Sequence, residues 1–274
     1  MLENVVYKNH LNEAFEFGKN GVFVNESDLH DYTWNITKKN NRISALDYAI
    51  TTKKLQVTII CSTEEEGVDK RNRLFEVTEK DVLAFQPGKL YVGSYYLNCY
   101  VTKSEKQKYL VNRRYMLVKL TLSTDCPYWV KETSTVFSAS SGGADAGGFD
   151  YSHDHPFDYG NDTTAKTINN PGFVASNFRL AIMGACTNPA INIAGHVYQV
   201  NTFVASGQYL LIDSANKTVT LQSSDGTKTN VFNSRNRDSY IFEKIPAGAS
   251  LVSWSGDFSF EVVLLEERSE PKWT

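Results

Sequence analysis

One stretch of this chain cannot contribute to a hydrophobic core, and it divides the sequence into two parts. Ser134 to Gly148 includes the run SASSGGADAGG, which is the composition of a flexible linker. Phe149 to Tyr159 follow, where aromatic residues recur among acids with neither a strand nor a helix period. Strand-like alternation lies on both sides. The sequence therefore predicts domains at residues 1–133 and 174–274, joined by a linker and aromatic arm at 134–173.

Length and composition are those of a globular protein. The chain has 274 residues, enough for two domains, and its 41% hydrophobic and 22% charged residues exclude disorder, collagen-like repeats and a coiled coil as the main class. Residues 1–131 carry 19 basic and 16 acidic side chains, whereas residues 132–274 carry 9 and 15. Neither part is basic enough to favour nucleic-acid binding, which needs a concentrated positive face.

Targeting and redox signals favour a protein made and folded in a cytoplasm. Met1 to His10 lack the basic and apolar regions of a signal peptide, and no apolar run approaches the ~20 residues of a membrane span. The cysteines, Cys61, Cys99, Cys126 and Cys186, form no CxxC pair, so we expect reduced core thiols and no disulfide framework.

The patterns in the first part predict a β-sandwich-like domain with one helix. Phe15 to Val24 alternate around a glycine turn and predict a hairpin, and Leu55 to Cys61 predict a half-buried strand. Ser62 stands three residues before Glu65, a capping-box spacing that predicts a helix running through Val77. A long antiparallel hairpin follows up to Leu122, and the charged run Lys103–Lys108 is its expected tip.

The patterns in the second part predict an antiparallel β-sandwich. Short alternating segments recur between turn signals with no helical segment among them. The last of them, Phe258 to Leu264, has one fully apolar face and is expected to be a central strand. The other segments are Phe178–Ile182, Ile191–Ile193, Tyr198–Val200, Leu210–Ile212, Val219–Leu221, Tyr240–Phe242 and Val252–Trp254.

Sequence motifs for catalysis or cofactor binding are missing. The chain contains no GxSxG, no phosphate-binding loop and no HExxH, and its linker glycines lack the GxGxxG spacing. One cluster deserves comparison with a metal site, because two histidines two residues apart point the same way on an extended chain. It comprises Asp150, His153, Asp154, His155 and Asp158. Metal ligands usually come from separate elements of a scaffold, whereas these residues share one short segment. We therefore interpret the segment as an aromatic arm that docks on a neighbouring surface, and not as a metal site.

A glycan-active or glycan-binding protein is the alternative that a β-sandwich leaves open. Three acids at strand ends are candidates for a carboxylate pair, namely Asp213, Glu243 and Asp257, although solvated acids are common there. Three aromatic residues could stack on a sugar ring, namely Tyr198, Tyr209 and Trp254, although core packing is the commoner use. The sequence thus predicts no enzyme and no catalytic, cofactor-binding or metal-binding residues.

The order of these elements resembles the distal tail proteins of bacteriophages and prophages with long non-contractile tails, of the siphovirus type. In the first part the resemblance lies in the strand order, the helix near Val68–Thr78 and the closing segment Leu120–Trp129. In the second part it lies in Phe178–Met183 with Gly184, in Asn188-Pro189 and Ile191, in Gly207 and Tyr209–Asp213, in Lys217-Thr218-Val219, in Ile245–Gly248, in Trp254 with Gly256, and in Arg268, Pro271, Lys272 and Trp273.

The resemblance implies a structural protein of the virion tail tip or baseplate. Its N-terminal domain would form a homohexamer ring between the tail tube protein and the tail-tip, tail-associated or receptor-binding proteins, and its C-terminal domain would be a galectin-like sandwich. The charge balance, the lack of a long apolar run and the missing motifs lead us to expect no nucleic acid, no membrane and no cofactor. Residues 174–274 leave no room for an inserted carbohydrate-binding module, so a glycan partner is not expected. A carbohydrate-binding or glycan-active sandwich remains the alternative function.

Overall fold

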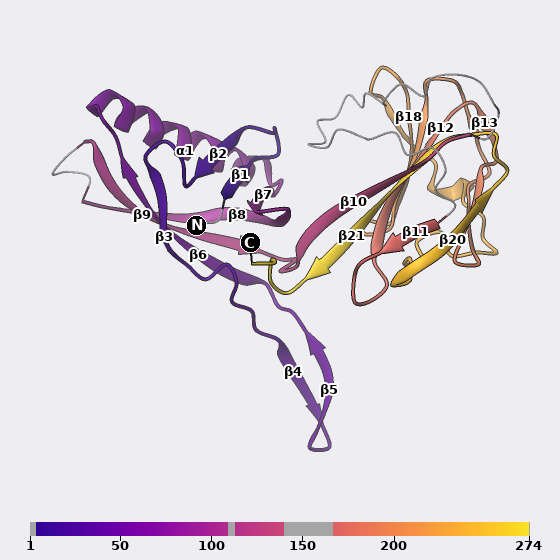
Figure 1. Cartoon of the computed structure of the whole chain (residues 1–274), viewed down its shortest axis with the longest axis horizontal. Helices are drawn as coiled ribbons and strands as arrows, with labels where there is room; N and C mark the ends of the chain where they lie inside the picture. The colour runs from indigo at the N-terminus through magenta and orange to yellow at the C-terminus, as the bar shows by residue number, and fades with distance from the viewer. Residues whose placement is uncertain (1–3, 109–112, 140–166, 274) are drawn as a thin grey trace. The chain divides into compact units, whose positions relative to one another are not determined.

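The computed structural model describes residues 4–108, 113–139 and 167–273 (Figure 1). The protein is mainly β, as the sequence predicts, and it divides into two compact units. Unit 1 comprises Met1–Val130 and Arg268–Thr274, and unit 2 comprises Lys131–Glu267. The chain passes from unit 1 to unit 2 within β10 (Trp129–Phe137) and returns at the end of β21 (Phe260–Arg268).

Two antiparallel sheets with a shared strand form unit 1. Its strands are β1 (Val5–Lys8), β2 (Ala14–Phe17), β3 (Val22–Ser27), β4 (Asn35–Lys39), β5 (Arg42–Asp47), β6 (Thr51–Ile60), β7 (Gly88–Val92), β8 (Tyr95–Gln107) and β9 (Tyr115–Thr124). One sheet has the order β2-β1-β7-β8 and the other β3-β6-β9-β8. Residues 95–99 of β8 pair with β7, and residues 100–107 pair with β9. Tyr7, Phe17 and Trp129 are among the largest fully buried side chains of this core.

The glycine turn after β2 connects the two sheets and does not close a hairpin. β2 pairs with β1, whereas β3 pairs with β6, so the predicted pairing between β2 and β3 is wrong. Gly21 has φ +76°, and a Cβ there would collide with the carbonyl oxygen of Ile60. The alternation does mark buried positions, because Phe15, Phe17 and Val22 all enter the same core, from opposite sheets. Alternation identifies a buried face but not the neighbouring strand.

The predicted helix is α1 (Glu64–Ala84), with its cap displaced by one residue. The N-cap is Thr63, whose hydroxyl accepts a hydrogen bond from the backbone N–H of Glu66 at 3.2 Å. The Glu66 carboxylate in turn accepts one from the backbone N–H of Ser62 at 3.0 Å. Reciprocal capping is therefore present, between Thr63 and Glu66 in place of Ser62 and Glu65. The helix ends at Phe85, which takes a left-handed conformation at φ 52°.

The long hairpin is present as β8 and β9, but its charged run is not a tip. Lys103 pairs with Thr121, and the ladder continues to Gln107 opposite Leu117. Lys103–Lys106 therefore form part of the strand. A charged run suits an exposed strand because side chains on one face of a sheet can remain solvated.

A second hairpin, which the sequence patterns did not reveal, projects from the rest of unit 1 (Figure 1). β4 and β5 pair only with each other among the described strands, and all their residues are exposed. Its turn at Asn40-Asn41 has φ 51° and 56°. We call it the arm hairpin. Three of its apolar side chains, Ile36, Ile43 and Leu46, are more than half exposed.

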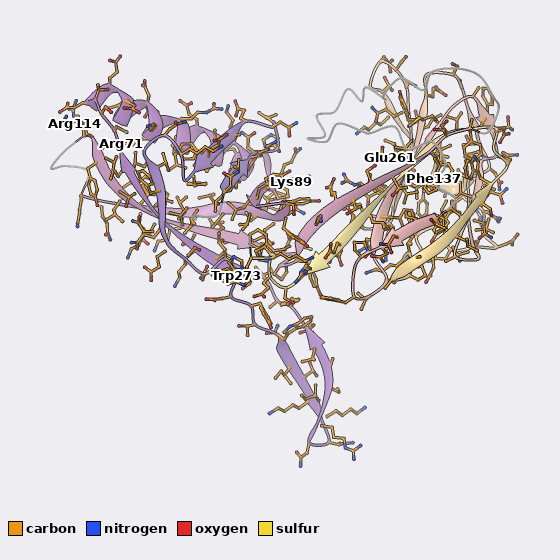
Figure 2. All side chains as sticks on the ribbon, in the orientation of Figure 1. Arg71, Lys89, Arg114, Phe137, Glu261 and Trp273 are labelled. Atoms are coloured by element: carbon orange, nitrogen blue, oxygen red, sulfur yellow. The ribbon has the colours of Figure 1, made fainter. Side chains whose placement is uncertain are left out.

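The last residues of the chain belong to unit 1. The Trp273 ring, labelled in Figure 2, stacks on His30 with centroids 3.7 Å apart, and the Arg268 guanidinium lies 5.8 Å from the centre of the Tyr95 ring. The sequence assigned these residues to the second domain. Stacking and cation–π contacts between distant segments leave no periodic signal in a sequence.

Unit 2 is an antiparallel sandwich. Its elements are β11 (Thr167–Asn170), β12 (Asn177–Met183), β13 (Cys186–Thr187), β14 (Ala190–Ile193), β15 (His196–Gln199), β16 (Phe203–Val204), β17 (Tyr209–Asp213), β18 (Thr218–Gln222), β19 (Lys228–Asn230), the short 3₁₀ helix η1 (Phe232–Ser234), β20 (Gly248–Trp254) and β21. One sheet has the order β19-β18-β17-β12-β21-β10, the other β11-β20-β14-β15. β21 is central, as predicted.

Two side chains from the predicted linker belong to the core of unit 2. Phe137 is 1% exposed and stacks on Phe260 with centroids 4.7 Å apart, and Ile168 is equally buried (Figure 2 labels Phe137). On the β10 side of the sheet, the buried carboxylate of Glu261 accepts a hydrogen bond from the Ser134 hydroxyl. Structured residues therefore extend into 134–173 from both ends.

No helix in the described ranges is long and apolar enough to span a bilayer.

Candidate functional site

The histidine cluster that the sequence compared with a metal site lies outside the described residues. This applies to Asp150, His153, Asp154, His155 and Asp158 alike. Within residues 4–108, 113–139 and 167–273, no group of three or more histidine, cysteine or acidic side chains is arranged to hold a metal ion.

Two of the three candidate carboxylates take part in local turns of unit 2. Asp213 ends β17 and accepts hydrogen bonds from the backbone and side-chain nitrogens of Asn216, both at 2.9 Å. Asp257 accepts one from the hydroxyl of Ser255, and Glu243 is exposed. A groove of about 400 Å³ on the β12-β17-β18 side includes Asp213 but neither of the other two. The structure shows no carboxylate pair assembled from these residues.

Two of the three candidate sugar-stacking aromatics are used in the core of unit 2. Tyr198 is 1% exposed and donates its hydroxyl hydrogen to the Glu243 carbonyl at 2.7 Å, and burial raises its pKa. The Trp254 indole nitrogen donates to the Phe258 carbonyl at 3.0 Å, and its ring packs edge-on against Phe260. Tyr209, on β17, is half-buried. A sugar-binding platform of these rings is therefore not present.

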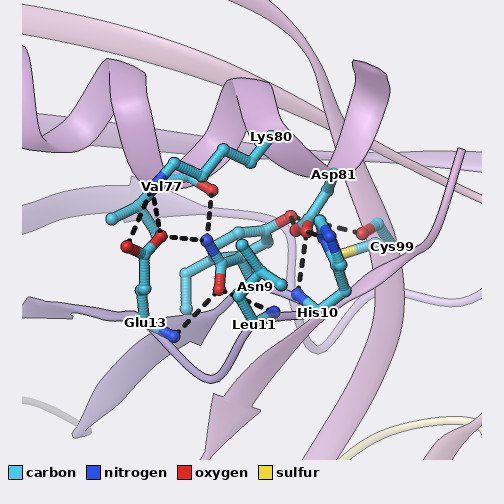
Figure 3. A network of polar contacts seen from close by, with 9 residues as sticks. Asn9, His10, Leu11, Glu13, Val77, Lys80, Asp81 and Cys99 are labelled. Carbon is cyan, nitrogen blue, oxygen red and sulfur yellow. Dashed lines mark hydrogen bonds and ion pairs between the residues drawn. The ribbon is translucent and has the colours of Figure 1, made fainter. Parts of the chain in front are cut away.

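In unit 1 a buried polar network fastens α1 to the strands (Figure 3). The carboxylate of Asp81, at the end of α1, is fully buried. It accepts hydrogen bonds from the Tyr7 hydroxyl at 2.5 Å and from the His10 backbone nitrogen at 2.8 Å, and the His10 ring nitrogen Nδ1 lies 2.6 Å away. Because β1 and the loop after it are held to the last turns of α1, the helix has a fixed position.

A second group of contacts extends the same network along the helix. The Asn9 side chain donates to Glu13 at 2.7 Å and to the Val77 carbonyl at 3.3 Å, and Lys80 donates to both Glu13 carboxylate oxygens at 2.8 Å. The hydrogen bonds from Lys80 and Asn9 lower the pKa of Glu13. Burial and the hydrogen bond to Asp81 raise the pKa of Tyr7. The network is thus built of groups that satisfy one another, as a structural cross-link requires.

The other side of α1 borders an open groove of about 700 Å³. One wall is α1 between Arg71 and Glu79, and the other is β8 between Val101 and Lys106. Its apolar lining includes Leu74, Val101 and Met116, which are all nearly buried, and Phe75, which is 55% exposed. We call it the α1–β8 groove. Its charged lining comprises Arg71, Lys103, Lys106 and Glu79, so it is predominantly basic.

One end of the groove is fixed where α1 approaches the start of β9. A Cβ at Gly67 would collide with the Arg113 carbonyl oxygen, so only glycine permits this approach. Arg71, labelled in Figure 2, donates to the same carbonyl and to that of Tyr115 at 3.3 Å. Its Nε is buried and has no hydrogen-bond partner among the described residues. Arg71 therefore retains a positive charge that no carboxylate of the described chain neutralises by a direct contact.

The β8 wall of the groove is an unpaired strand edge. Residues 100–107 pair with β9 on one side, while β7 covers the opposite side only as far as Cys99. No other described strand pairs with Val101–Lys106. An exposed edge of this kind offers backbone donors and acceptors to an added strand. The sequence indicated a hairpin here but could not show that the helix and this edge form one groove.

Comparison with known proteins gives matches to solved structures only. No protein-family model and no curated protein matches the chain. A chain of the phage P2 baseplate in its activated conformation with Ca is 13% identical, with a TM-score of 0.62, over 99% of this chain and 100% of that one. The corresponding structure with Sr is 12% identical over the same shares, with the same TM-score.

The Dit protein of phage SPP1 matches as well. Its structure is described as a paradigm of the hub adsorption apparatus in phages that infect Gram-positive bacteria. It is 9% identical to this chain, with a TM-score of 0.56, and the match covers 98% of this chain and 100% of that one. The resemblance to distal tail proteins is thus confirmed at the level of fold. From end to end, this chain has the fold of phage baseplate and hub proteins.

Proposed function

We propose that this protein is a structural component of the tail tip or baseplate of a phage or prophage with a long non-contractile tail. Six copies would form a hub that joins the tail tube to the tip and to the host-adsorption apparatus. One observation carries the proposal: the fold match spans both units, covering 98–99% of this chain and the whole of each matched chain. A match confined to a common β-sandwich would cover only one unit.

Features of unit 1 support a role in assembly. Unit 1 carries an unpaired strand edge and a hairpin whose apolar side chains are exposed, and such features are used for subunit contacts. The partners would be other copies of the chain, the tail tube protein, and tail-associated or receptor-binding proteins. Nucleic acid and membrane have no part in this proposal. The protein would be made in the bacterial cytoplasm and would end at the virion tail tip.

A glycan-active protein is the weaker alternative. In unit 2 Asp213 and Asp257 are held in turns, and Tyr198 and Trp254 are used in core contacts. The proposed hub needs neither catalysis nor a cofactor.

Deletion of the gene from the phage or prophage, with complementation by an epitope-tagged copy, tests the proposal. We expect the deletion to yield heads without working tails, and gold-labelled antibody to mark the tail tip of complemented particles. Infectious particles of normal morphology without the protein would overturn the hub role. So would complemented, purified particles from which the protein is absent by mass spectrometry.

A further inference from the structure

The sheet β3-β6-β9-β8 of unit 1 has unpaired edges at both ends. β8 is open along Val101–Lys106, and β3 pairs with β6 on one side and with no described strand on the other. The two open edges are of similar length, since β3 spans Val22–Ser27. An edge that is long enough to pair is a liability in a monomer unless another chain covers it.

The directions of these strands favour one way of joining copies. Every neighbouring pair in the sheet is antiparallel, and the four strands are even in number. β3 and β8 therefore run in opposite directions. If two copies point the same way, β3 of one copy meets β8 of the next as an antiparallel pair. Repetition of a heterologous contact between copies of equal orientation closes a ring when the rotation permits.

The chemistry of the two edges is complementary. The α1–β8 groove is basic, through Arg71, Lys103 and Lys106, while β3 presents Glu26, for which the described residues offer no hydrogen bond or ion pair. Lys103 already contacts Glu105 at 3.1 Å on the surface, and a second carboxylate can share it.

The arm hairpin is a poorer occupant of the groove. Its charged side chains are Lys38, Lys39, Arg42 and Asp47, so its end carries the same sign of charge as the groove. Placing like charges together in an interface costs affinity.

We propose that the α1–β8 groove receives β3 of a second copy of this chain, which adds to β8 as an antiparallel strand. The inference rests on the proposed hub function and specifies the contact that would build the ring. Aligning the acid of β3 with a base of β8 sets Glu26 opposite Lys103. Because Asn25 is a bulge in β3, Val24 then lies opposite Ser104, and Phe23 lies opposite Glu105.

Paired cysteines test this register in the full-length protein and in purified tails. In a Cys126→Ser background, we expect disulfide-linked oligomers from Glu26→Cys with Lys103→Cys and from Phe23→Cys with Glu105→Cys, because both members of each pair lie on the sheet face away from the core. The mismatched pair Phe23→Cys with Ser104→Cys should link several-fold less, because its side chains lie on opposite faces of the sheet. Asn40→Cys in the arm hairpin with Glu105→Cys is the control for random collision.

Charge reversal provides a second measurement. Glu26→Lys or Lys103→Glu alone should weaken self-association by about tenfold, and the double variant should restore most of it. Glu76→Lys, on an exposed position of α1 outside the groove lining, is the matched control and should change little.

The possible outcomes distinguish failure of the strand contact from failure of the proposed function. Rings or tail tips that contain the protein but give no Phe23–Glu105 link would overturn the strand contact and leave the hub role standing. A link from Glu105→Cys to the arm hairpin or to another tail protein would assign the groove to that occupant instead. Absence of the protein from tails, with no self-association, would overturn both.

Discussion

Asp81 is the residue on which the position of α1 depends most directly. Its fully buried carboxylate accepts hydrogen bonds from Tyr7 and from the His10 backbone, and both lose their acceptor if it is removed. We predict that Asp81→Ala lowers the free energy of unfolding by about 3 kcal/mol. Urea unfolding followed by tryptophan fluorescence measures this change.

Two further variants serve as comparisons for Asp81→Ala. Tyr7→Phe removes one hydroxyl and should cost about 1–2 kcal/mol. Asp69→Ala, at an exposed position of the same helix, should remain within about 0.5 kcal/mol of the wild type. Equal stabilities for Asp81→Ala and Asp69→Ala would show that the network does not hold the helix.

Glu13 makes part of the stability of unit 1 depend on pH. Its folded-state pKa is lowered, chiefly by the hydrogen bond from Lys80. Its contribution is therefore complete above the unfolded-state pKa of about 4.3 and is lost as the pH falls through the folded-state value. We predict that Glu13→Gln is less stable than the wild type at pH 7 and that the difference disappears near pH 3. Thermal melting across this range would contradict the prediction if the difference stayed constant.

The four thiols should differ in reactivity. Cys61, Cys99 and Cys186 are buried, whereas Cys126 is exposed. Burial raises the pKa of the Cys99 thiol and raises that of Cys186 to about 11, so neither forms thiolate readily at pH 8. We predict one fast-reacting thiol with a disulfide reagent under native conditions. That phase should vanish in Cys126→Ser, and a fast phase that persists there would refute the assignment.

At the scale of elements, the sequence predicted what depends on local periodicity. The strands of the β8–β9 hairpin and the helix were recognisable because their buried side chains repeat at two or about 3.6 residues. The partner of each strand was harder to predict from the sequence. Phe15 and Phe17 alternate as a hairpin strand should, yet β2 pairs with β1 because the Gly18–Gly21 turn leads to the other sheet.

Single core residues in a polar segment also escaped the sequence patterns. Phe137 and Ile168 lie among serine, threonine and asparagine and have no periodic neighbours, so composition assigned them to the linker. The Asn-Asn turn of the arm hairpin was a usable signal, because asparagine tolerates positive φ. The α1–β8 groove had no such signal, since it depends on the distance between a helix and a strand edge.

These core residues lead to a prediction about fragments of the chain. Residues 131–267 include Phe137, Ile168 and β11, which pairs with β20. We predict that this fragment melts cooperatively. The shorter fragment 174–274, which lacks all three, should be less stable by several kcal/mol, because each lost apolar side chain costs about 2–4 kcal/mol. Differential scanning calorimetry compares them, and equal melting temperatures would show that 134–173 adds nothing to the core.

At the scale of the whole molecule, the account depends on how copies assemble. The fold match covers the entire chain, and the sheet β3-β6-β9-β8 has two open edges that run in opposite directions. Together these features favour a closed ring with all copies pointing the same way. Association could be weak in isolation, so the assembly must be examined over a range of concentrations and with the tail tube protein present.

Electron microscopy of the full-length protein, alone at high concentration and with its tail tube protein, tests this account most directly. We predict ring-shaped particles with sixfold symmetry, whose mass by light scattering corresponds to six copies. Persistent monomers, or twofold dimers with no ring under either condition, would contradict the hub and favour the glycan-binding alternative for unit 2.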